Sequence, residues 1–388
     1  MADTFAIVGA ALAGARAAET LRAEGFDGRV VLLGAEPHLP YERPALSKGY
    51  LQGSAEAPFV HPAEWYAEQD VNLRISTPVT ALDPPGHEIE TADGDRLRYT
   101  KLLLTTGSSV RQLADAVTLR TLDDSDRLRA ALRPGVRVVV VGAGWIGLEV
   151  AAAARMAGAE VTVLEQAAAP LLAVLGPEMA AVFAQLHVEH GVDLRCGVTV
   201  RAVRSDAVLL DDGAVPADLV VAGIGVTPDV VLARAAGLTV DNGIVVDEHL
   251  RSSDPDVLAA GDVANAYHPF LGEHLRVEHW ANALHQPVVA AKTMLGQDAV
   301  YDRLPYFFTD QYDLGMEYTG FGGGELVVRG EGREFVAFWL RDGRLTAAMN
   351  VNVWTGVPEA ARELIRSRTR LDSAALADPE VPLEDVAA

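Results

Sequence analysis

Short apolar runs that end in glycine turns recur along the chain and predict strands that alternate with helices. An apolar run at 4–8 precedes a glycine-containing turn, a helical run at 13–24 and a second apolar run at 29–33. The same order returns at 137–141, the turn GAGWIG, 146–157 and 160–164. Each is a β-α-β unit of about 30 residues. We therefore expect an α/β protein with two nucleotide-binding cores built on parallel sheets.

The rest of the chain shows shorter elements. Aromatic residues cluster after about Leu304, and the pattern that follows predicts a small α+β domain with a closing helix at 357–367. The tail past Leu371 is rich in proline, alanine and acidic residues, and we expect it to lie extended. Further strands are expected at 101–105, 198–203, 207–210, 219–222, 326–329 and 334–340, a strand–turn element at 257–262, and a further helix at 279–295.

Composition narrows the possible functions. The 388 residues carry a formal charge of −22, which argues against binding to nucleic acid or to anionic membranes. The apolar stretch at 136–164 contains four charged residues, so we expect no membrane span, and the N-terminus does not resemble a signal peptide. The single cysteine, Cys196, excludes an internal disulfide and an iron–sulfur cage, and it fits a reducing, cytoplasmic setting. The histidines show no paired ligand spacing, so no metal is predicted.

The first glycine turn runs from Gly9 to Gly14 and departs from the dinucleotide fingerprint G-x-G-x-x-G at one position, Ala11. A methyl group there limits how closely the backbone approaches a pyrophosphate, but it does not abolish binding. Glu36 follows about 22 residues after Gly14, near the ~20 expected for a carboxylate that binds a ribose hydroxyl. An ordinary tight turn that binds nothing is the alternative.

The second turn matches the fingerprint fully, with Gly142, Gly144 and Gly147, and with Ile146 in its last variable position. Glu165 ends the next strand, where a carboxylate accepts from the ribose 2′-hydroxyl of NAD and repels the 2′-phosphate of NADP. We therefore predict NADH as co-substrate. Two such sites suggest one bound flavin and one exchanging nicotinamide. Asp262, the last residue of the strand–turn element at 257–262, is a candidate ligand of the flavin ribityl chain, although in isolation an ordinary Asx turn is the better explanation.

Six segments of the chain form recognisable motifs: PHLPYERPALSK, GAGWIGLEVAAAAR, GIGVTPD, LRSSDPDVLAAGDV, VEHWANA and DQYDLGMEYTGF. Together these segments resemble the FAD-dependent ferredoxin and rubredoxin reductases, which are putidaredoxin-reductase-like members of the glutathione-reductase-like superfamily. The resemblance covers nearly the whole chain. It implies an FAD-binding domain at 1–112 and 241–304, an NADH-binding domain at 113–240 and a C-terminal α+β interface domain at 305–388.

The resemblance also implies roles for single residues. Lys48 lies beside the reactive edge of the flavin, paired with Glu149, and both are the candidate catalytic residues. A carboxylate in the first turns of a phosphate-binding helix needs a cation partner, which independently favours this pair. Other implied FAD contacts are Arg43, Val79, Gly107, Arg120 and Trp280, and Gly225 is an implied NAD contact.

The implied activity is hydride transfer from NADH to non-covalent FAD, followed by single-electron transfer to a ferredoxin-type iron–sulfur protein serving an oxygenase. Disulfide reductases and NADH oxidases need cysteines after the first β-α-β unit, where this chain has Arg43 to Lys48 instead. For Cys196, a role as a small buried apolar residue is favoured over a redox role. Two alternatives remain open: a rubredoxin or other small-acceptor reductase, and a redox signalling flavoprotein similar to apoptosis-inducing factor. We expect a monomer or a weak dimer.

Overall fold

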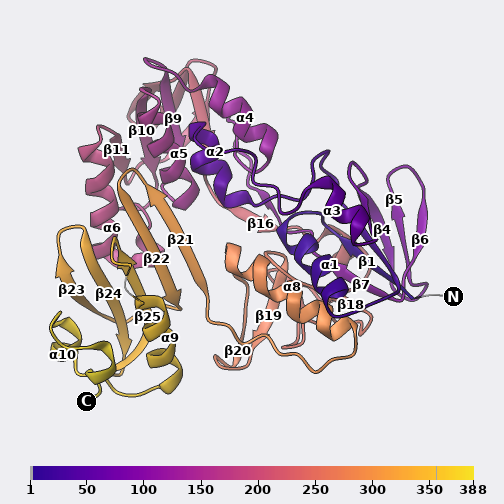
Figure 1. Cartoon of the computed structure of the whole chain (residues 1–388). Coiled ribbons are helices and arrows are strands. Elements are labelled where there is room, and N and C mark those ends of the chain that lie inside the picture. The colour runs from indigo at the N-terminus through magenta and orange to yellow at the C-terminus, as the bar shows by residue number, and fades with distance from the viewer. Residues whose placement is uncertain (1–2, 355) are drawn as a thin grey trace. The chain divides into compact units, whose positions relative to one another are not determined.

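The computed structural model describes residues 3–354 and 356–388, which form two compact units (Figure 1). The first unit comprises residues 3–42, 57–109 and 226–303. The second comprises residues 43–56, 110–225 and 304–388 apart from residue 355. The division into an FAD domain, an NADH domain and a C-terminal domain, with the boundaries given above, stays a prediction.

A five-stranded sheet forms the centre of the first unit. Its order is β18-β7-β1-β2-β3 and all neighbouring strands run parallel, as the first β-α-β pattern predicts. Helix α1 (Leu12–Ala23) follows β1 and packs against α8 (Trp280–Met294), which Figure 1 draws beside it. The strands are β1 Thr4–Val8, β2 Arg29–Leu33, β3 Val71–Arg74, β7 Lys101–Leu104 and β18 Val257–Ala259.

Two smaller sheets and two short helices complete this unit. One sheet is antiparallel with the order β4-β5-β6, and the other has the order β17-β19-β20. Their strands are β4 Val79–Asp83, β5 Glu88–Thr91, β6 Arg96–Arg98, β17 Ile244–Val246, β19 Ala264–His268 and β20 Glu273–Leu275, and the helices are α3 Ala63–Glu68 and α7 Val231–Ala235. Strands β8 (Ser108–Val110) and β16 (Val226–Pro228) occupy two places where the chain passes from one unit to the other.

The second unit contains the other predicted β-α-β motif. Its parallel sheet has the order β11-β10-β9-β15, with helix α5 (Trp145–Met156) after β9 and helix α6 (Leu172–Glu189) after β10. The strands are β9 Arg137–Val141, β10 Glu160–Glu165, β11 Asp193–Cys196 and β15 Leu219–Ala222. Helix α4 (Leu122–Ala131) precedes this sheet, and an antiparallel sheet of β12 Val200–Val203, β13 Ala207–Leu210 and β14 Gly213–Pro216 follows β11.

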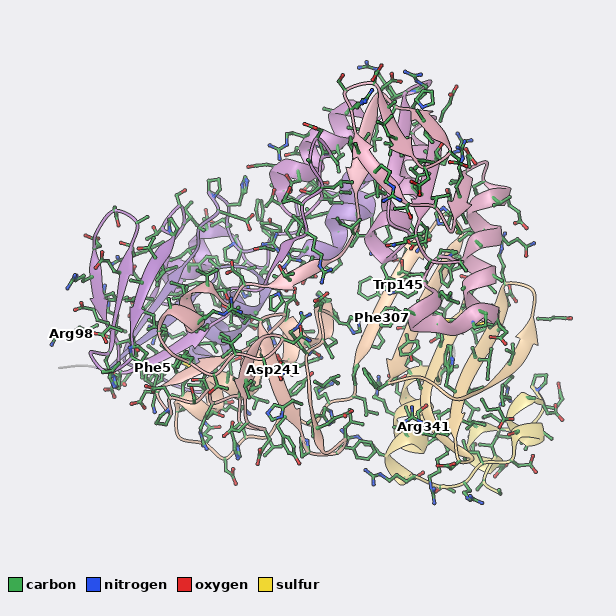
Figure 2. All side chains as sticks on the ribbon, turned by 180° about the vertical axis from the view of Figure 1, so that it is seen from behind. Phe5, Arg98, Trp145, Asp241, Phe307 and Arg341 are labelled. Atoms are coloured by element: carbon green, nitrogen blue, oxygen red, sulfur yellow. The ribbon has the colours of Figure 1, made fainter. Side chains whose placement is uncertain are left out.

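An antiparallel sheet with the order β21-β22-β25-β24-β23 forms the C-terminal part of the second unit, drawn in orange and yellow in Figure 1. Helix α9 (Val357–Ser367) packs against β22 and β25. Strand β21 also contacts helix α5, and the rings of Trp145 and Phe307 lie 5.0 Å apart at this contact (Figure 2). The strands are β21 Tyr306–Gln311, β22 Leu314–Gly320, β23 Glu325–Glu331, β24 Glu334–Arg341 and β25 Arg344–Val351.

The expectation of an extended tail past Leu371 is wrong. The tail forms helix α10 (Ser373–Ala377) and a 3₁₀ turn, η2 (Leu383–Asp385). The carboxylate of Asp372 accepts hydrogen bonds from the backbone N–H groups of Ala374 and Ala375, which caps the helix. Leu376 and Val386 are fully buried. Sparse apolar residues therefore anchor a polar segment whose composition alone suggested no structure.

A 14-residue segment, Arg43–Glu56, belongs to the second unit although its neighbours on both sides belong to the first. It forms the 3₁₀ helix η1 (Arg43–Ser47) and the short helix α2 (Gly49–Gln52), which contact helices α4 and α5. This segment carries Lys48 into the second unit.

Within residues 3–354 and 356–388, every helix is too short or too polar to cross a lipid bilayer.

Candidate active site

The turn between β9 and α5 contains three glycines, of which two are required by the turn itself and one leaves space for a ligand. Gly142 has φ of +99°, and a Cβ there would lie 2.5 Å from the carbonyl oxygen of Gly223. A Cβ on Gly147 would lie 2.1 Å from the carbonyl oxygen of Gly142. Both positions thus require glycine for the turn itself.

Gly144 is different, because its backbone is extended (φ −78°, ψ −178°) and no described atom lies within 4 Å of a Cβ built on it. The fold leaves this space open. Gly144 is also the N-cap of α5, and in the described structure no side chain caps this helix. The N–H groups of the first turn are therefore available to an anion, as in helices that bind a pyrophosphate. The turn fits the phosphates of a dinucleotide.

The turn between β1 and α1 has the same construction. Gly9 has φ of +117°, and a Cβ there would lie 2.1 Å from the carbonyl oxygen of Thr105. A Cβ on Gly14 would lie 2.1 Å from the carbonyl oxygen of Gly9. Ala11 occupies the N-cap position with an extended backbone (φ −109°, ψ −161°) and no side-chain cap in the described structure. The turn therefore accepts Ala11 without strain, and the departure from the fingerprint leaves its geometry intact.

Glu165 lies at the end of β10 and contacts the second glycine turn. One carboxylate oxygen accepts from the backbone N–H of Ala143 at 2.6 Å, and the other accepts from the N–H of Ala167 at 2.8 Å. Cys196 is paired with Glu165 across strands β10 and β11. Burial, with the nearby charge of Glu165 as a smaller cause, raises the pKa of the Cys196 thiol. The carboxylate is thus held at the turn, beside a thiol that stays protonated.

Glu36 and Trp280 are each held by a neighbour within the first unit. The hydroxyl of Tyr41, a fully buried side chain, donates to the Glu36 carboxylate at 2.5 Å. The indole N–H of Trp280, at the start of α8, donates to the carboxylate of Glu42 at 2.9 Å. Sequence reasoning missed Tyr41, although it stands inside the PHLPYERPALSK segment.

The turn at Gly261 and Asp262 is fixed through its backbone. The N–H of Gly261 donates to the side-chain oxygen of Gln286 at 2.8 Å, and the carbonyl oxygen of Asp262 accepts from Arg276 at 3.3 Å. Gln286 is a buried residue of α8 that sequence reasoning also missed.

Four further predicted residues lie on elements with defined contacts. Val79 begins β4 and is half-buried, and the carbonyl oxygen of Gly107 accepts from the N–H of Asp229 at 2.9 Å. In the second unit, the carbonyl oxygen of Gly225 accepts from the N–H of Arg111 at 2.9 Å, and Ile146 is 45 % exposed.

Lys48 and Glu149 form an ion pair in the second unit. The Nζ atom of Lys48 lies 2.7 Å from Oε1 of Glu149, and their side chains are 15 % and 2 % exposed. A buried carboxylate without a partner costs several kcal/mol, so the pair stabilises both charges. The Lys48 ammonium also lies 5.3 Å from the ring centre of Phe308. The structure therefore brings together the two residues named as candidate catalytic groups.

Two hydroxyl groups complete the environment of Glu149. Ser47 donates to its Oε2 atom, and Thr309 of strand β21 donates to Oε1 at 2.5 Å. With Lys48, the carboxylate receives three donors from two segments, residues 43–56 and strand β21. Sequence reasoning missed both hydroxyls. Ser47 is part of a quoted motif, whereas no signal in the sequence points to Thr309.

Arg43 and Arg120, both predicted FAD contacts, are connected to each other in the second unit. The guanidinium of Arg43 donates to the backbone carbonyl of Arg120. The N–H of Arg120 donates to Asp124 at 3.0 Å, in the capped first turn of α4. The structure places Arg43, Lys48 and Arg120 in the second unit, and Gly9, Ala11, Gly14, Glu36, Val79, Gly107, Asp262 and Trp280 in the first.

Known proteins match the chain over nearly its full length. The family model described as pyridine nucleotide-disulphide oxidoreductase matches residues 3–286, and the model described as reductase C-terminal matches residues 306–387. The ferredoxin–NAD(+) reductase component of the anthranilate 1,2-dioxygenase system of Burkholderia cepacia is 45 % identical over 403 residues and covers 99 % of each chain.

Putidaredoxin reductase of Pseudomonas putida is 37 % identical over 410 residues, which covers 100 % of this chain and 97 % of that protein. A crystal structure of the covalent putidaredoxin reductase–putidaredoxin complex matches with a TM-score of 0.95 and 37 % identity, covering 99 % of this chain and 98 % of that chain.

Proposed function

Because this chain belongs to the pyridine nucleotide-disulphide oxidoreductase family, we propose that it is an NADH-dependent ferredoxin reductase that supplies electrons to an oxygenase. One NADH and two oxidised ferredoxins give NAD⁺, a proton and two reduced ferredoxins. The observation that carries the proposal is the end-to-end similarity to the ferredoxin–NAD(+) reductase component of a dioxygenase system. The residues of the two glycine turns and of the Lys48–Glu149 pair fit this reaction.

NADH binds at the turn from Gly142 to Gly147. The open space over Gly144 and the uncapped start of α5, within the described structure, support a pyrophosphate there. Glu165 accepts from the ribose hydroxyls, because its carboxylate already stands at this turn. A 2′-phosphate would meet the same negative charge, so NADH is preferred over NADPH.

FAD binds non-covalently at the turn from Gly9 to Gly14, with Glu36 at its ribose. When bound, FAD supplies the redox chemistry that couples a two-electron donor, NADH, to a one-electron acceptor, the ferredoxin. Lys48 supplies positive charge where negative charge develops during hydride transfer, an electrostatic contribution to catalysis. Glu149 orients the Lys48 ammonium, and Ser47 and Thr309 orient Glu149.

A protein thiol takes no part in this reaction. The chain has one cysteine, so it forms no internal disulfide despite the name of its family. The raised pKa of the Cys196 thiol keeps it protonated and a poor nucleophile. Electrons therefore pass directly to the iron–sulfur partner. We place the protein in the cytoplasm, which the low cysteine content supports, as a monomer or weak dimer.

The test is anaerobic reduction of the purified protein. A yellow protein that releases FAD on acid precipitation, is bleached by NADH and then reduces a ferredoxin supports the proposal. The Cys196→Ser variant should turn over at nearly the wild-type rate. A colourless protein that does not bind added FAD, or a reduced protein that passes electrons to small acceptors but to no ferredoxin, contradicts it.

A further inference from the structure

A series of buried hydrogen bonds leads from Glu149 into the second unit. Thr309 Oγ1 donates to Glu149 Oε1 at 2.5 Å, and the side-chain nitrogen of Gln311 donates to Thr309 Oγ1 at 3.2 Å. Nε2 of His187 lies 2.9 Å from the side-chain oxygen of Gln311. His187, Thr309 and Gln311 are at most 1 % exposed. Because buried polar groups need partners, these side chains depend on one another.

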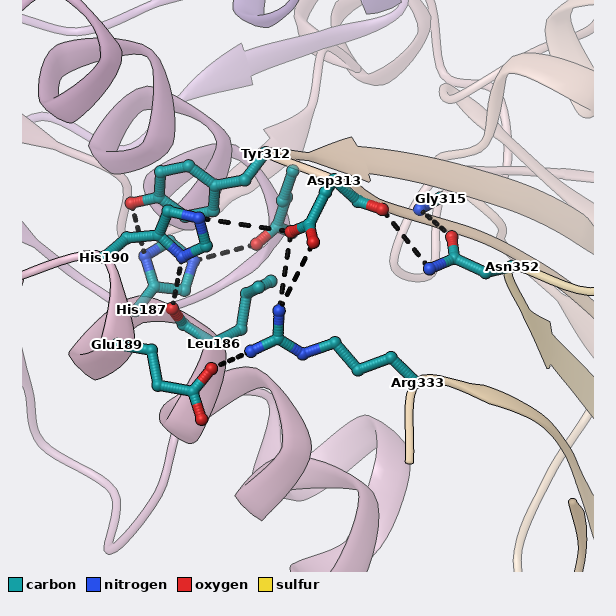
Figure 3. Close-up of polar contacts among 10 residues, drawn as sticks. Leu186, His187, Glu189, His190, Tyr312, Asp313, Gly315, Arg333 and Asn352 are labelled. Carbon is teal, nitrogen blue, oxygen red and sulfur yellow. Dashed lines mark hydrogen bonds and ion pairs between the residues drawn. The ribbon is translucent and has the colours of Figure 1, made fainter. Parts of the chain in front are cut away.

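The protonation state of His187 determines which atoms of this series donate hydrogen bonds and which accept them. Burial lowers the pKa of His187 to about 4, so at neutral pH its ring carries a single N–H. Its Nδ1 atom lies 3.5 Å from the hydroxyl oxygen of Tyr312, and Figure 3 marks this contact with a dashed line. Burial raises the pKa of Tyr312, which therefore keeps its proton and can donate to Nδ1. The one ring proton then belongs to Nε2, which donates to Gln311.

The orientation of Gln311 follows from that proton. Its carboxamide oxygen accepts from His187, so its NH₂ group faces Thr309. An NH₂ group only donates, so the Thr309 oxygen accepts from it, and the single hydroxyl proton is left for Glu149. In the reversed amide orientation the hydroxyl would donate to Gln311 instead. The ring proton of His187 therefore decides whether Glu149 receives a bond from Thr309.

We propose that His187, Gln311 and Thr309 are positioning residues that hold the carboxylate of Glu149 against Lys48 through a one-way series of hydrogen bonds. The inference rests on the proposed function, in which Glu149 orients Lys48. His187 comes from helix α6, whereas Thr309 and Gln311 come from strand β21. The C-terminal sheet thus takes part in arranging the hydride-transfer site. The amide of Gln311 exchanges protons slowly, so the series orients Glu149 and carries no proton.

The first test is nitrogen-15 NMR of the histidine rings in the full-length protein as purified, at pH 7. One neutral histidine should carry its proton on Nε2, and its signals should disappear in His187→Gln. Where that variant does not fold, Gln311→Leu must shift the same signals. A proton on Nδ1 of His187, or a positively charged ring, overturns the inference. This measurement involves neither NADH nor ferredoxin, so its outcome is separate from that of the proposed function.

The second test separates rate from affinity in anaerobic stopped-flow reduction by NADH. Thr309→Val removes one hydrogen bond to Glu149, and the limiting reduction rate should fall roughly five- to tenfold. The Kd for NADH should stay within about twofold, because the phosphate and ribose contacts lie elsewhere. Thr309→Ser keeps the hydroxyl and should restore the rate.

Thr319→Val is the matched control. Thr319 is a buried residue of neighbouring strand β22, and its hydroxyl has no hydrogen-bond partner within residues 3–354 and 356–388. This variant should reduce at the wild-type rate. The inference is overturned if Thr309→Val does the same, if Thr319→Val is equally slow, or if Thr309→Val weakens NADH binding and leaves the limiting rate unchanged. Failure of the wild type to reduce ferredoxin counts against the proposed function and leaves the NMR result standing.

Discussion

The backbone N–H of Ala143 donates a 2.6 Å hydrogen bond to the carboxylate of Glu165, so the residue that ends β10 is tied to the turn that begins α5. The second carboxylate oxygen accepts from Ala167. Negative charge is thereby fixed beside the open space over Gly144.

Replacing Glu165 should erode the preference for NADH. Glu165→Ala removes the ribose acceptor and the charge that repels a 2′-phosphate, and Glu165→Arg supplies a phosphate ligand. One to two hydrogen bonds are involved, so kcat/KM for NADH relative to NADPH should change by about 1–3 kcal/mol. Glu160→Ala, an exposed site at the other end of the same strand, is the control. A wild-type preference for NADPH would contradict the assignment.

Gly144→Ala should impair binding without impairing folding. The backbone suits any residue and no described atom lies within 4 Å of the new methyl group, so Tm should stay unchanged. The methyl group would occupy the space of the pyrophosphate, and the Kd for NADH should rise at least about tenfold, or about 1.4 kcal/mol.

Two companion variants sharpen this prediction. Gly147→Ala should lower Tm, because its Cβ would lie 2.1 Å from a carbonyl oxygen. Ala11→Gly restores the glycine of the fingerprint and should tighten FAD binding. Titration of NADH and of FAD against each variant, with thermal melts, measures all of these. Unchanged NADH affinity in Gly144→Ala would place the pyrophosphate elsewhere.

Lys48→Met should slow hydride transfer and lower the flavin midpoint potential. The substitution keeps an unbranched side chain and removes the cation, which leaves Glu149 buried without its charge partner. Breaking a buried pair typically costs about 3–5 kcal/mol, and the partial exposure of Lys48 reduces that cost. Flavin content should change little. The measurements are anaerobic stopped-flow reduction by NADH and a potentiometric flavin titration.

Lys292→Met is the matched control for this prediction, because Lys292 forms an ion pair with Glu24 at 3.2 Å and both side chains are about one-third exposed. Glu149→Gln should give a milder defect than Lys48→Met, and the double variant should be less impaired than the sum of the singles. If Lys48→Met reduces at the wild-type rate with an unchanged potential, the lysine lies away from the reacting ring.

Acid should destabilise the protein partly through His187. Its pKa is about 4 in the folded protein against about 6.5 in the unfolded chain, because burial opposes the charged form. The unfolded chain binds more protons below pH 6.5, so stability falls as the pH drops from 6.5 toward 4. At pH 5 the loss from this residue is about 2 kcal/mol.

Denaturant melts at pH 7 and pH 5 test this prediction. The wild type should lose more stability between the two pH values than His187→Gln, which has no titrating ring. The neighbouring groups that titrate or carry charge include Arg155, whose charge acts on Tyr312, and His190, which stacks on Tyr312. They also include Asp313, Glu189 and Arg333, shown in Figure 3. Equal losses in both proteins would show that His187 is not held neutral.

Sequence reasoning succeeded where the signal is local. Strands β1, β2, β9 and β15 occupy the residues expected from their apolar runs, because a buried parallel strand bounded by a glycine turn is visible in a single window. The pairing of Lys48 with Glu149 is predicted partly by the resemblance and partly by the need of a carboxylate near bound phosphates for a cation partner. The binding roles of Arg43, Val79, Arg120 and Trp280 stay predictions.

Contacts between distant segments were missed. Thr309 lies 160 residues from Glu149 and His187 lies 124 residues from Gln311. The sequence around a threonine on a strand does not indicate which distant carboxylate the threonine contacts in the folded protein. Tyr41 and Gln286 were missed for the same reason, since each holds its partner through the fold. The prediction of an extended tail past Leu371 was wrong because the apolar residues that anchor this tail are too widely spaced to form a periodic pattern.

The detour of residues 43–56 into the second unit has a consequence for the order in which the protein folds. Ser47 and Lys48 leave the ribosome first, Glu149 follows about 100 residues later, and Thr309 comes last, so two donors precede the carboxylate and the third arrives long after it. Contacts so distant in sequence close slowly. The nascent chain can complete the burial of Glu149 only after β21 has been synthesised, and until then the second nucleotide-binding core holds an incompletely paired charge.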